Sequence, residues 1–493
     1  MQTTEQIIRT IKTGNRILIS VMLKDLIDAE KVKKDRVEQI YGRYDQRETA
    51  VPIMTRKYAN YEKAHNRLPH DFVGDITDMK VGYMGNAVKI ELSKEFYMPE
   101  TDDETPKVLE GPDKAKYESH SKVLKDFHNL NNAEDSNSDM VQMASLGGVG
   151  FRLLYIAMVN KQKVVKYKNI PPYECILFVD GTTGEPQYGM IYYKIEVRDI
   201  NTTENKILKK EKLYVEWYDE KQVYYFLEDD KGVLEPDFRH EPTQEPHWFD
   251  GVPIIAFPNN TQERGNCEKV LPLIDAYDRV FSDGVNEIEQ LRSAYMWAKG
   301  AGMNVDDAFM KQIEQTGVFP LSEDGSIGFV EKNLTFDGLQ SILKEARRNI
   351  YQFAKSVDLS VDQGGDKRVI GWQIALLNLE NDCKETERKF IAALNRQYKL
   401  ITQFWTSLTE MSEIRDFDHA AITYTFTRNF PRDLYGEMQT LEIAIGLLSR
   451  ETAYSLMSFI DDPGDEKKAF DLENKSPLDL NNVNNINPLN TGE

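Results

Sequence analysis

Histidine side chains are the first groups in this chain to consider as metal ligands. The seven histidines include two close pairs, His65 with His70 and His240 with His247. Neither pair has the i, i+4 spacing that places two imidazoles on one helical face for zinc. We therefore expect exposed loop histidines and no metal site.

The three cysteines are the next candidates, because a thiolate can act as a nucleophile or bind a metal. Cys175, Cys267 and Cys383 lie far apart and outside any CxxC motif. No adjacent base that would activate one of them is visible in the sequence. We predict three reduced, packed thiols.

Two further patterns could bind phosphate or calcium. The glycines at 147–150 follow an expected helix and lead into an expected strand. This order is the reverse of the strand-to-helix order that directs backbone amides at a phosphate, so it indicates a turn. The acidic stretch 461–466 lacks the ligand spacing of a calcium loop and indicates the end of a helix. With no P-loop or GxSxG motif, the sequence predicts no catalytic residue, cofactor or metal.

Composition limits the classes of function that remain. The 493 residues are 40% hydrophobic, which is ordinary for a folded protein, and the formal net charge is −20. Such a charge argues against tight binding of nucleic acid, because phosphate contacts need clustered Lys and Arg. No run of eighteen apolar residues and no apolar signal core occur, so we expect neither a membrane span nor secretion.

The elements that must position any site begin with helices and then change to strands. Two helices are expected up to about residue 63, a third closes near 85–86, and another covers about 122–146. Alternating patterns then predict an antiparallel sheet. Its expected strands are 152–158, 163–167, 174–179, 188–197, 213–218 and 223–227.

Two long helices with opposite charges follow a short apolar strand at 252–258. The first, 271–297, has an apolar stripe at helical spacing and a face that we expect to be solvated and acidic. The acidic residues are Asp275, Asp278, Asp283, Glu287 and Glu289. The second, 337–357, has a basic face formed by Lys344, Arg347 and Arg348. The two charged faces are expected to meet, within or between subunits.

The remaining segments surround these two helices. A compact, glycine-containing insert at 299–334 carries a short helix near 305–315, and a glycine-rich break follows the second long helix. A third long helix is expected from about 372 to 408, with a middle that is polar on all sides. A strand, helices near 435–448 and 451–461, and a disordered tail from about 474 complete the chain.

Several blocks of sequence resemble the portal proteins of tailed double-stranded DNA bacteriophages, of the siphophage type. The early block NRLPHD at 66–71 with GYMGN at 82–86 is similar to a segment of that family, with Ala87 in place of the common proline. The strand VPIIAFPNN at 252–260 and the helix entry LIDAYD at 273–278 are also similar. So are GWQIA at 371–375 and LE at 379–380.

The resemblance implies an α+β, predominantly helical chain with the portal fold, whose twelve copies form a ring with wing, stem, clip and crown regions. The implied regions are N-terminal helices and a wing at 1–266, a first stem helix at 267–298, a clip at 299–334, a second stem helix at 335–357, a tunnel loop at 358–371, a long wing helix and strand at 372–428, crown helices at 429–470 and a disordered tail at 471–493.

The implied function is a ring at one capsid vertex of the virion, through which double-stranded DNA is packaged and ejected. The ring would nucleate head assembly in the host cytoplasm. Its implied partners are the terminase large subunit, head-completion or connector proteins, and capsid and scaffolding proteins, but no membrane. The alternatives are another ring-forming connector or tail protein, or a DNA-processing enzyme.

Two sets of residues are expected to make these contacts. The tunnel loop is expected to touch DNA through Gln363, Asp366, Lys367 and Arg368. Alternatively, the two cations of this loop pair with Asp362, Asp366 or a neighbouring subunit. The clip is expected to meet terminase and connector proteins through Met303, Asp306, Asp307, Lys311, Glu323 and Asp324.

Overall fold

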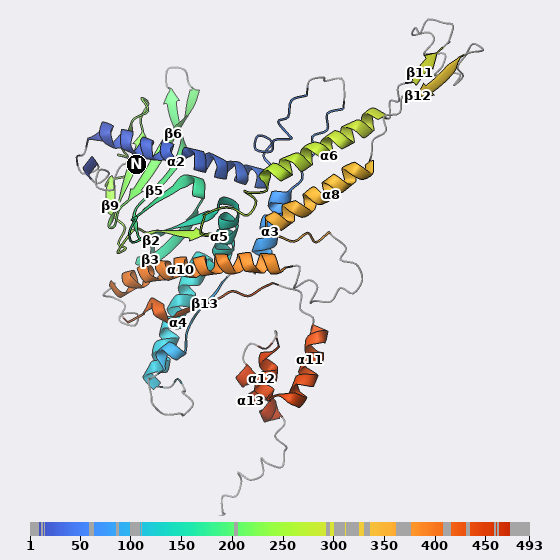
Figure 1. Ribbon diagram of the computed structural model, residues 1–493. Helices are drawn as coiled ribbons and strands as arrows, with labels where there is room; N and C mark the ends of the chain where they lie inside the picture. Colours follow the sequence, from blue (N-terminus) through green and yellow to red (C-terminus); the bar gives the residue numbers. More distant parts are fainter. Residues whose placement is uncertain are drawn as a thin grey trace, which may run out of the picture. The chain divides into compact units, whose positions relative to one another are not determined.

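The chain folds as two compact units, which are described separately below. The computed structural model describes residues 9–10, 13, 15–58, 64–84, 88–98, 109, 111–201, 206–291, 296–299, 311, 325–329, 336–360, 376–407, 416–429, 434–457, 460 and 463–473. The first unit contains residues 1–362 and 376–428, and the second contains 363–375 and 429–493. The first unit contains both helices and antiparallel strands, and most of its strands follow one another between groups of helices, so the fold is α+β (Figure 1).

Capped helices begin the first unit. The helix α2, Arg16–Tyr44, starts at Asn15, whose side chain accepts a hydrogen bond from the Leu18 amide. The helix α3, Phe72–Tyr83, starts in the same way at Asp71, which accepts from the Gly74 amide. A side-chain acceptor at this position satisfies one of the amides that a helix leaves unpaired at its start.

The helix expected at 122–146 is two helices in the structure. The helix α4, Gly111–Asn131, ends beside Asn132, and α5, Ala133–Gly147, follows it at once. Asn132 has a φ of 47°, a left-handed conformation that asparagine tolerates better than most residues. The Asn131 side chain accepts from the Tyr167 amide and donates to the Val165 carbonyl, so the break fixes this corner to a strand.

Two antiparallel sheets form the centre of the first unit, and the six predicted strands are confirmed within them. The three-stranded sheet has the order β10–β2–β3, and the larger sheet has the order β4–β5–β6–β7–β8, with β9 also paired to β7. Their bounds are β2 Val149–Val159, β3 Gln162–Ile170, β4 Cys175–Val179, β5 Pro186–Asn201, β6 Lys206–Tyr218, β7 Gln222–Glu228, β8 Leu234–Pro236, β9 Gln244–Pro246 and β10 Ile254–Pro258.

The turn predicted at 147–150 joins α5 to β2 and depends on a glycine. Gly148 has a φ of 83°, and a Cβ atom there would lie 2.1 Å from the Glu263 carbonyl oxygen. Both the dihedral angle and the lack of space exclude a side chain. The prediction of a turn rather than a phosphate loop is therefore consistent with the structure.

Among the described residues, three apolar clusters hold these layers together. Ile19, Met22 and Leu23 of α2 pack on the larger sheet around the fully buried Trp217. A second cluster lies between the two sheets. The third cluster joins α2, α3, α6 and α8, and it includes Ile40, Phe72, Val73, Ile76, Ile274, Tyr277, Ile350 and Tyr351.

The two long helices after the sheets are shorter than predicted. The helix α6 covers Leu271–Leu291 and α8 covers Phe336–Phe353, and they lie side by side (Figure 1). Residues 296–297 were expected to be helical, but they belong to the strand β11, Met296–Lys299, which pairs with β12, Ser326–Phe329. A run such as MWAK fits a helix or a strand equally well, so periodicity could not locate this boundary.

The third long helix crosses the sheets and is not polar on all sides in its middle. This helix, α10, covers Leu377–Ser407 and packs against β10, where Phe390 meets Phe257 at a ring distance of 5.1 Å. Asp382, Cys383 and Thr386 in its middle are buried. The strand β13, Ile422–Thr425, pairs with β1, Lys89–Leu92.

The described residues of the second unit form three helices. They are α11, Leu434–Leu447, α12, Arg450–Ser455, and α13, Pro463–Glu473. The stretch 461–466 was expected to end a helix, but Pro463 begins α13, because proline is well tolerated at the first helical position. Residues 471–473 are therefore helical rather than part of the predicted tail, and 474–493 lie outside the described residues.

Candidate functional site

The candidate site is built on α6 and α8, whose apolar stripes face each other. At one end of this helix pair, which we call its base, both stripes also pack against α2 and α3. Ile274 and Tyr277 of α6 and Ile350 of α8 belong to the same buried cluster. Gly284 allows close approach of the two helices, because a Cβ atom there would lie 2.8 Å from Leu339 Cδ2. The predicted stripes are therefore confirmed at the base of the pair.

The polar face of α6 binds an extended segment of the same chain, residues 64–70, which we call the strap. The Asn66 amide donates to Asn286 Oδ1 at 2.7 Å, and the Leu68 amide donates to Ser282 Oγ at 3.1 Å. The His70 amide donates to Asp278 Oδ1 at 3.1 Å. The three acceptors are buried, with exposures of 5%, 0% and 3%.

The regular spacing of these contacts has a geometric cause. Acceptors four residues apart on a helix are about 6 Å apart along its axis. Alternate amides of an extended chain are about 6.6 Å apart. Asp278, Ser282 and Asn286 therefore present acceptors at nearly the spacing that an extended strand requires, and the strap pairs with a helix as it would with a strand edge.

Two arginines form ion pairs with further carboxylates on the same face of α6. Arg43 binds Asp275 through both terminal nitrogens, at 2.7 and 3.2 Å, and Arg56 binds Asp283 at 2.7 and 3.3 Å. Glu289 accepts from the Asn66 side chain. The prediction of a solvated acidic face is wrong for Asp278, which is buried, and correct for Glu289, which is exposed. The side chains of Asp275 and Asp283 lie between these limits, at 26% and 47% exposed, because the two arginines cover them in part.

Among the described residues, the predicted basic face of α8 forms no ion pair with this acidic face. Arg347 binds Asp358, just beyond α8, through Nε at 2.6 Å and a second nitrogen at 3.0 Å. Burial alone would raise the pKa of Asp358, but Arg347 and the hydrogen bonds from Ser360 hold it below its usual value. Arg348 lies 3.8 Å from Glu345 of its own helix, and Lys344 is exposed.

One carboxylate near the end of α8 is shared by two lysines. Asp382 Oδ2 lies 2.7 Å from Lys80 Nζ of α3, and Asp382 Oδ1 lies 2.8 Å from Lys355 Nζ. The side chains of Lys80 and Asp382 are 1% and 5% exposed, whereas that of Lys355 is 48% exposed. Burial alone would raise the pKa of Asp382, but the two lysines hold it below its usual value.

Neutral side chains complete the surroundings of the buried pair. Lys80 Nζ also donates to Asn259 Oδ1 at 2.7 Å, to Thr386 Oγ1 at 2.9 Å and to Asn266 Oδ1 at 3.3 Å. The Asn266 amide group donates to Asp382 Oδ2 at 2.7 Å. These contacts satisfy a buried charge pair that would otherwise be costly. We call the set the Asp382 cluster: Lys80, Asn259, Asn266, Lys355, Asp382 and Thr386.

Comparison with known proteins identifies the family. The sequence matches the family described as "Phage portal protein, SPP1 Gp6-like" over residues 23–476. The chain belongs to this family. Over 372 residues it is 25% identical to the portal protein of Bacillus phage SPP1. This aligned region covers 71% of this chain and 70% of the SPP1 protein. The chain is 20% identical over 465 residues to the portal protein of Clostridium phage phiCD119, with coverages of 92% and 95%.

Family membership gives the chain the role of a phage portal protein. The resemblance stated from sequence motifs is thereby confirmed across nearly the whole portal chain. No helix among the described residues is both long and apolar enough to cross a membrane.

Most of the residues expected to contact DNA or other proteins lie outside the described parts of the portal chain. Gln363, Asp366, Lys367 and Arg368 of the expected tunnel loop all do so. In the expected clip, Lys311 is described and helical, whereas Met303, Asp306, Asp307, Glu323 and Asp324 lie outside the described residues.

The cysteines and most of the histidines discussed above are buried or partly buried among other side chains. All three cysteines are free and buried, as predicted, and burial raises the pKa of each thiol to about 12. The prediction of exposed histidines is correct for His240 and wrong for His247, which is buried. His65 stacks on Tyr58, and His70 contacts Asp278, so both are only partly exposed.

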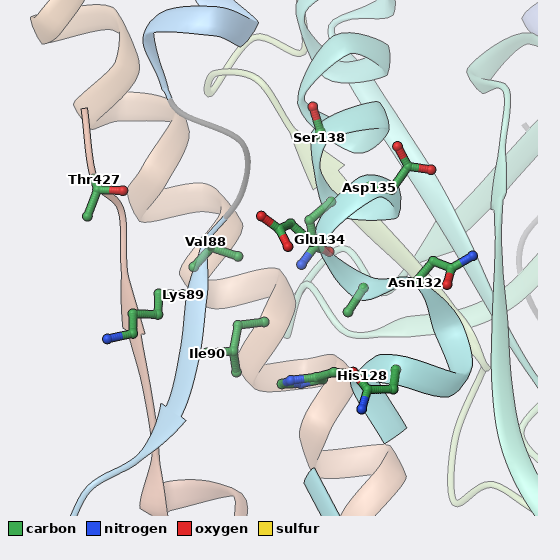
Figure 2. A pocket seen from close by; sticks show the side chains of 12 residues that line it. Val88, Lys89, Ile90, His128, Asn132, Glu134, Asp135, Ser138 and Thr427 are labelled. Carbon is green, nitrogen blue, oxygen red and sulfur yellow. The ribbon is translucent and has the colours of Figure 1, made fainter. Parts of the chain in front are cut away.

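An open cavity of about 1080 Å³ lies between β1, the corner of α4 and α5, and the segment after β13 (Figure 2). Its polar lining includes Lys89, His128, Glu134 and Asp135. Among the described residues, no group of three or more histidine, cysteine or acidic side chains is arranged to hold a metal.

Sequence reasoning missed the strap and the Asp382 cluster. Both depend on pairs of residues more than 200 positions apart, such as Asn66 with Asn286 and Lys80 with Asp382. One signal was available: Asp278, Ser282 and Asn286 repeat every four residues, which is a polar stripe on the same helix as an apolar one.

Proposed function

We propose that the portal chain assembles into a closed ring at one vertex of the phage capsid, and that double-stranded DNA is packaged and ejected through this ring. Family membership supports this proposal. The observation that carries it is the apolar surface that α6 and α8 leave uncovered. Ile288, Ile342 and Phe353 are 46%, 61% and 55% exposed. Apolar side chains on a packed helix pair favour contact with a neighbouring copy, and a repeated head-to-tail contact can close into a ring.

We assign the regions of this ring as follows. The helices α6 and α8 form the stem, and the two sheets with α10 form the wing. The insert at 299–334 forms the clip, 358–371 forms the tunnel loop, and 429–470 forms the crown. In this arrangement the acidic and basic stem faces could still meet between copies through Lys344 and Arg348, which have no acidic partner on α6 of their own chain.

The charge of the chain suits a conduit. Twelve copies would carry −240, from 12 × −20. A stem helix of 21 residues is about 31 Å long, and duplex DNA over that length carries about 18 charges. Mutual repulsion would keep DNA centred and free to slide. The role inferred here is structural rather than enzymatic.

The tunnel loop is proposed to make the exceptional DNA contact. Lys367 and Arg368 are cations in an otherwise acidic protein, next to Gln363 and Asp366. In phage whose portal protein carries both Lys367→Ala and Arg368→Ala, we expect slower packaging or shorter packaged DNA. Gel analysis of DNA extracted from purified heads measures the length and amount of the packaged DNA. Full-length DNA packaged at the normal rate would contradict the contact.

The proposed partners follow from the regions. The clip would bind the terminase large subunit during packaging and head-completion or connector proteins later, through Met303, Asp306, Asp307, Lys311, Glu323 and Asp324. The wing would contact capsid and scaffolding proteins. The virion vertex is the proposed location, with assembly in the host cytoplasm.

Electron microscopy of the purified portal chain tests the ring directly. Negative-stain images should contain rings with a central hole, and the mass of the intact ring should equal a whole number of copies. The rings should persist in high salt, because ion pairs at an exposed interface contribute little and apolar contacts dominate. Monomers at every concentration and salt would overturn the proposal.

A further inference from the structure

The Asp382 cluster connects the end of one proposed stem helix to the long helix α10. Lys355 lies two residues after the end of α8, and Asp382 lies in the second turn of α10. Asp382 thus receives one lysine from a fully buried position and one from a half-exposed position. The two ion pairs differ mainly in their access to water.

Lys355 ends α8 in the left-handed conformation that commonly closes a helix. Its φ is 57°, its amide donates to the Gln352 carbonyl at 3.2 Å, and the Ser356 amide donates to the Tyr351 carbonyl at 2.9 Å. Glycine or asparagine is more usual than lysine at this position. Just beyond this helix end, Lys355 Nζ reaches Asp382 Oδ1 at 2.8 Å.

Release of Lys355 would leave the rest of the cluster intact. Asp382 would keep its contacts with Lys80 and with Asn266, both at 2.7 Å. The Lys355 ammonium group, which is already half exposed, would become hydrated. Release of Lys80 would instead leave a buried carboxylate poorly paired, which is far less favourable.

We propose that the Lys355–Asp382 ion pair is a releasable coupling, which holds α8 and α10 at a fixed angle when closed and lets the two helices move relative to each other when open. Lys80 and Asp382 are the permanent half of this coupling. The stem role of α8, and hence any effect on DNA transport, rests on the function proposed above. The coupling itself does not depend on that function.

Spin labels on the two helices test the coupling in the intact chain. Gln352→Cys and Arg388→Cys place labels at exposed positions on α8 and α10, and the three native cysteines are buried and should not react. We expect one narrow distance distribution. Adding Lys355→Asn should produce a second population of label distances or at least double the width of the distance distribution, because the cation is lost. Asparagine is chosen because it tolerates a positive φ.

Two matched variants separate charge from general disturbance. Lys355→Arg keeps the cation and should retain the narrow distribution. Lys384→Asn removes another exposed lysine of α10, which pairs with Glu380 at 3.4 Å, and should change nothing. An unchanged distribution in Lys355→Asn would overturn the coupling. So would equal broadening in Lys384→Asn.

Salt gives a measurement that needs no substitution in the cluster. A half-exposed ion pair is screened by salt, whereas the buried pair is screened much less. The labelled protein should therefore broaden between low and high NaCl. A distribution that is independent of NaCl up to 1 M would count against the coupling even if Lys355→Asn failed to fold.

Phage assays then test what the coupling does. In phage supplied with the Lys355→Asn portal, rings should form normally while the amount or rate of DNA packaged changes at least twofold. Normal packaging together with a broadened label distance would overturn the role in DNA transport and leave the coupling. Absence of rings in the unsubstituted protein would instead overturn the proposed function.

Discussion

At the scale of single residues, burial decides the chemistry of two basic side chains, His128 and Arg152. His128 Nε2 lies 2.8 Å from the Tyr398 hydroxyl, and burial lowers the pKa of the imidazole to about 4. Arg152 is fully buried, and within the described parts of the chain its guanidinium group donates to the neutral acceptors Asn137, Asn169, Gln397 and Ser136. Neither role could be inferred from the sequence, because each depends on the packing of α4, α5 and α10.

The lowered pKa of His128 predicts a loss of stability in mild acid. The unfolded chain takes up a proton on this imidazole below pH 6.5, whereas the folded chain does so only near pH 4. The contribution of neutral His128 is therefore complete above pH 6.5 and falls as the pH drops towards 4, by at most about 1.4 kcal/mol for each pH unit.

His128→Gln should consequently make stability less dependent on pH in this window. Urea unfolding of the original protein and the variant at several pH values between 7 and 4.5 measures the difference. His240→Gln, at an exposed histidine, serves as the control and should leave the slope unchanged. Equal slopes for all three proteins would show that the His128 imidazole titrates normally.

At the scale of elements, the strap and α6 stabilise each other through backbone amides. Asn286→Ala should lower the free energy of unfolding by about 1–3 kcal/mol, because the Asn66 amide loses its buried acceptor. Hydrogen exchange at residues 64–70 should accelerate in the same variant. Arg279→Ala, at an exposed position of α6, should change neither quantity.

How far the elements could be predicted depends on the range of the interactions that define them. Alternating residues along the strands identified the two sheets, and apolar stripes identified α6, α8 and α10. The break at Asn132 and the strand at Met296–Lys299 were missed, because distant partners determine them. The acidic face of α6 was identified correctly as acidic, but it is only partly solvated, because the sequence does not show that Arg43, Arg56 and the strap cover part of it.

At the scale of the whole molecule, the stem surface proposed above should control assembly. Ile342→Glu places a charge on an exposed apolar position of α8, so we expect ring formation to fall at least tenfold while the chain stays folded. Mass photometry of the purified protein measures the populations. Val32→Glu changes an even more exposed apolar residue of α2 and should assemble normally. Normal rings with Ile342→Glu would place the interface elsewhere.

Family membership was the part of the whole-molecule description that the sequence supported best. Motifs at 66–86, 252–278 and 371–380 led to it, and the match over residues 23–476 confirms it. Catalytic motifs were absent, so the assignment depended on the order of segments and on scattered local similarities. The residues that contact DNA and other proteins stay predictions, because contacts between molecules are not encoded in the periodicity of one chain.

The spacing of Asp278, Ser282 and Asn286 also limits how the gene can change length during evolution. One inserted codon between these positions would rotate the rest of α6 by about 100° and move the following acceptors away from the strap. Insertions and deletions in related genes should therefore be rare between codons 278 and 286, and more frequent in the stretch that encodes 299–334.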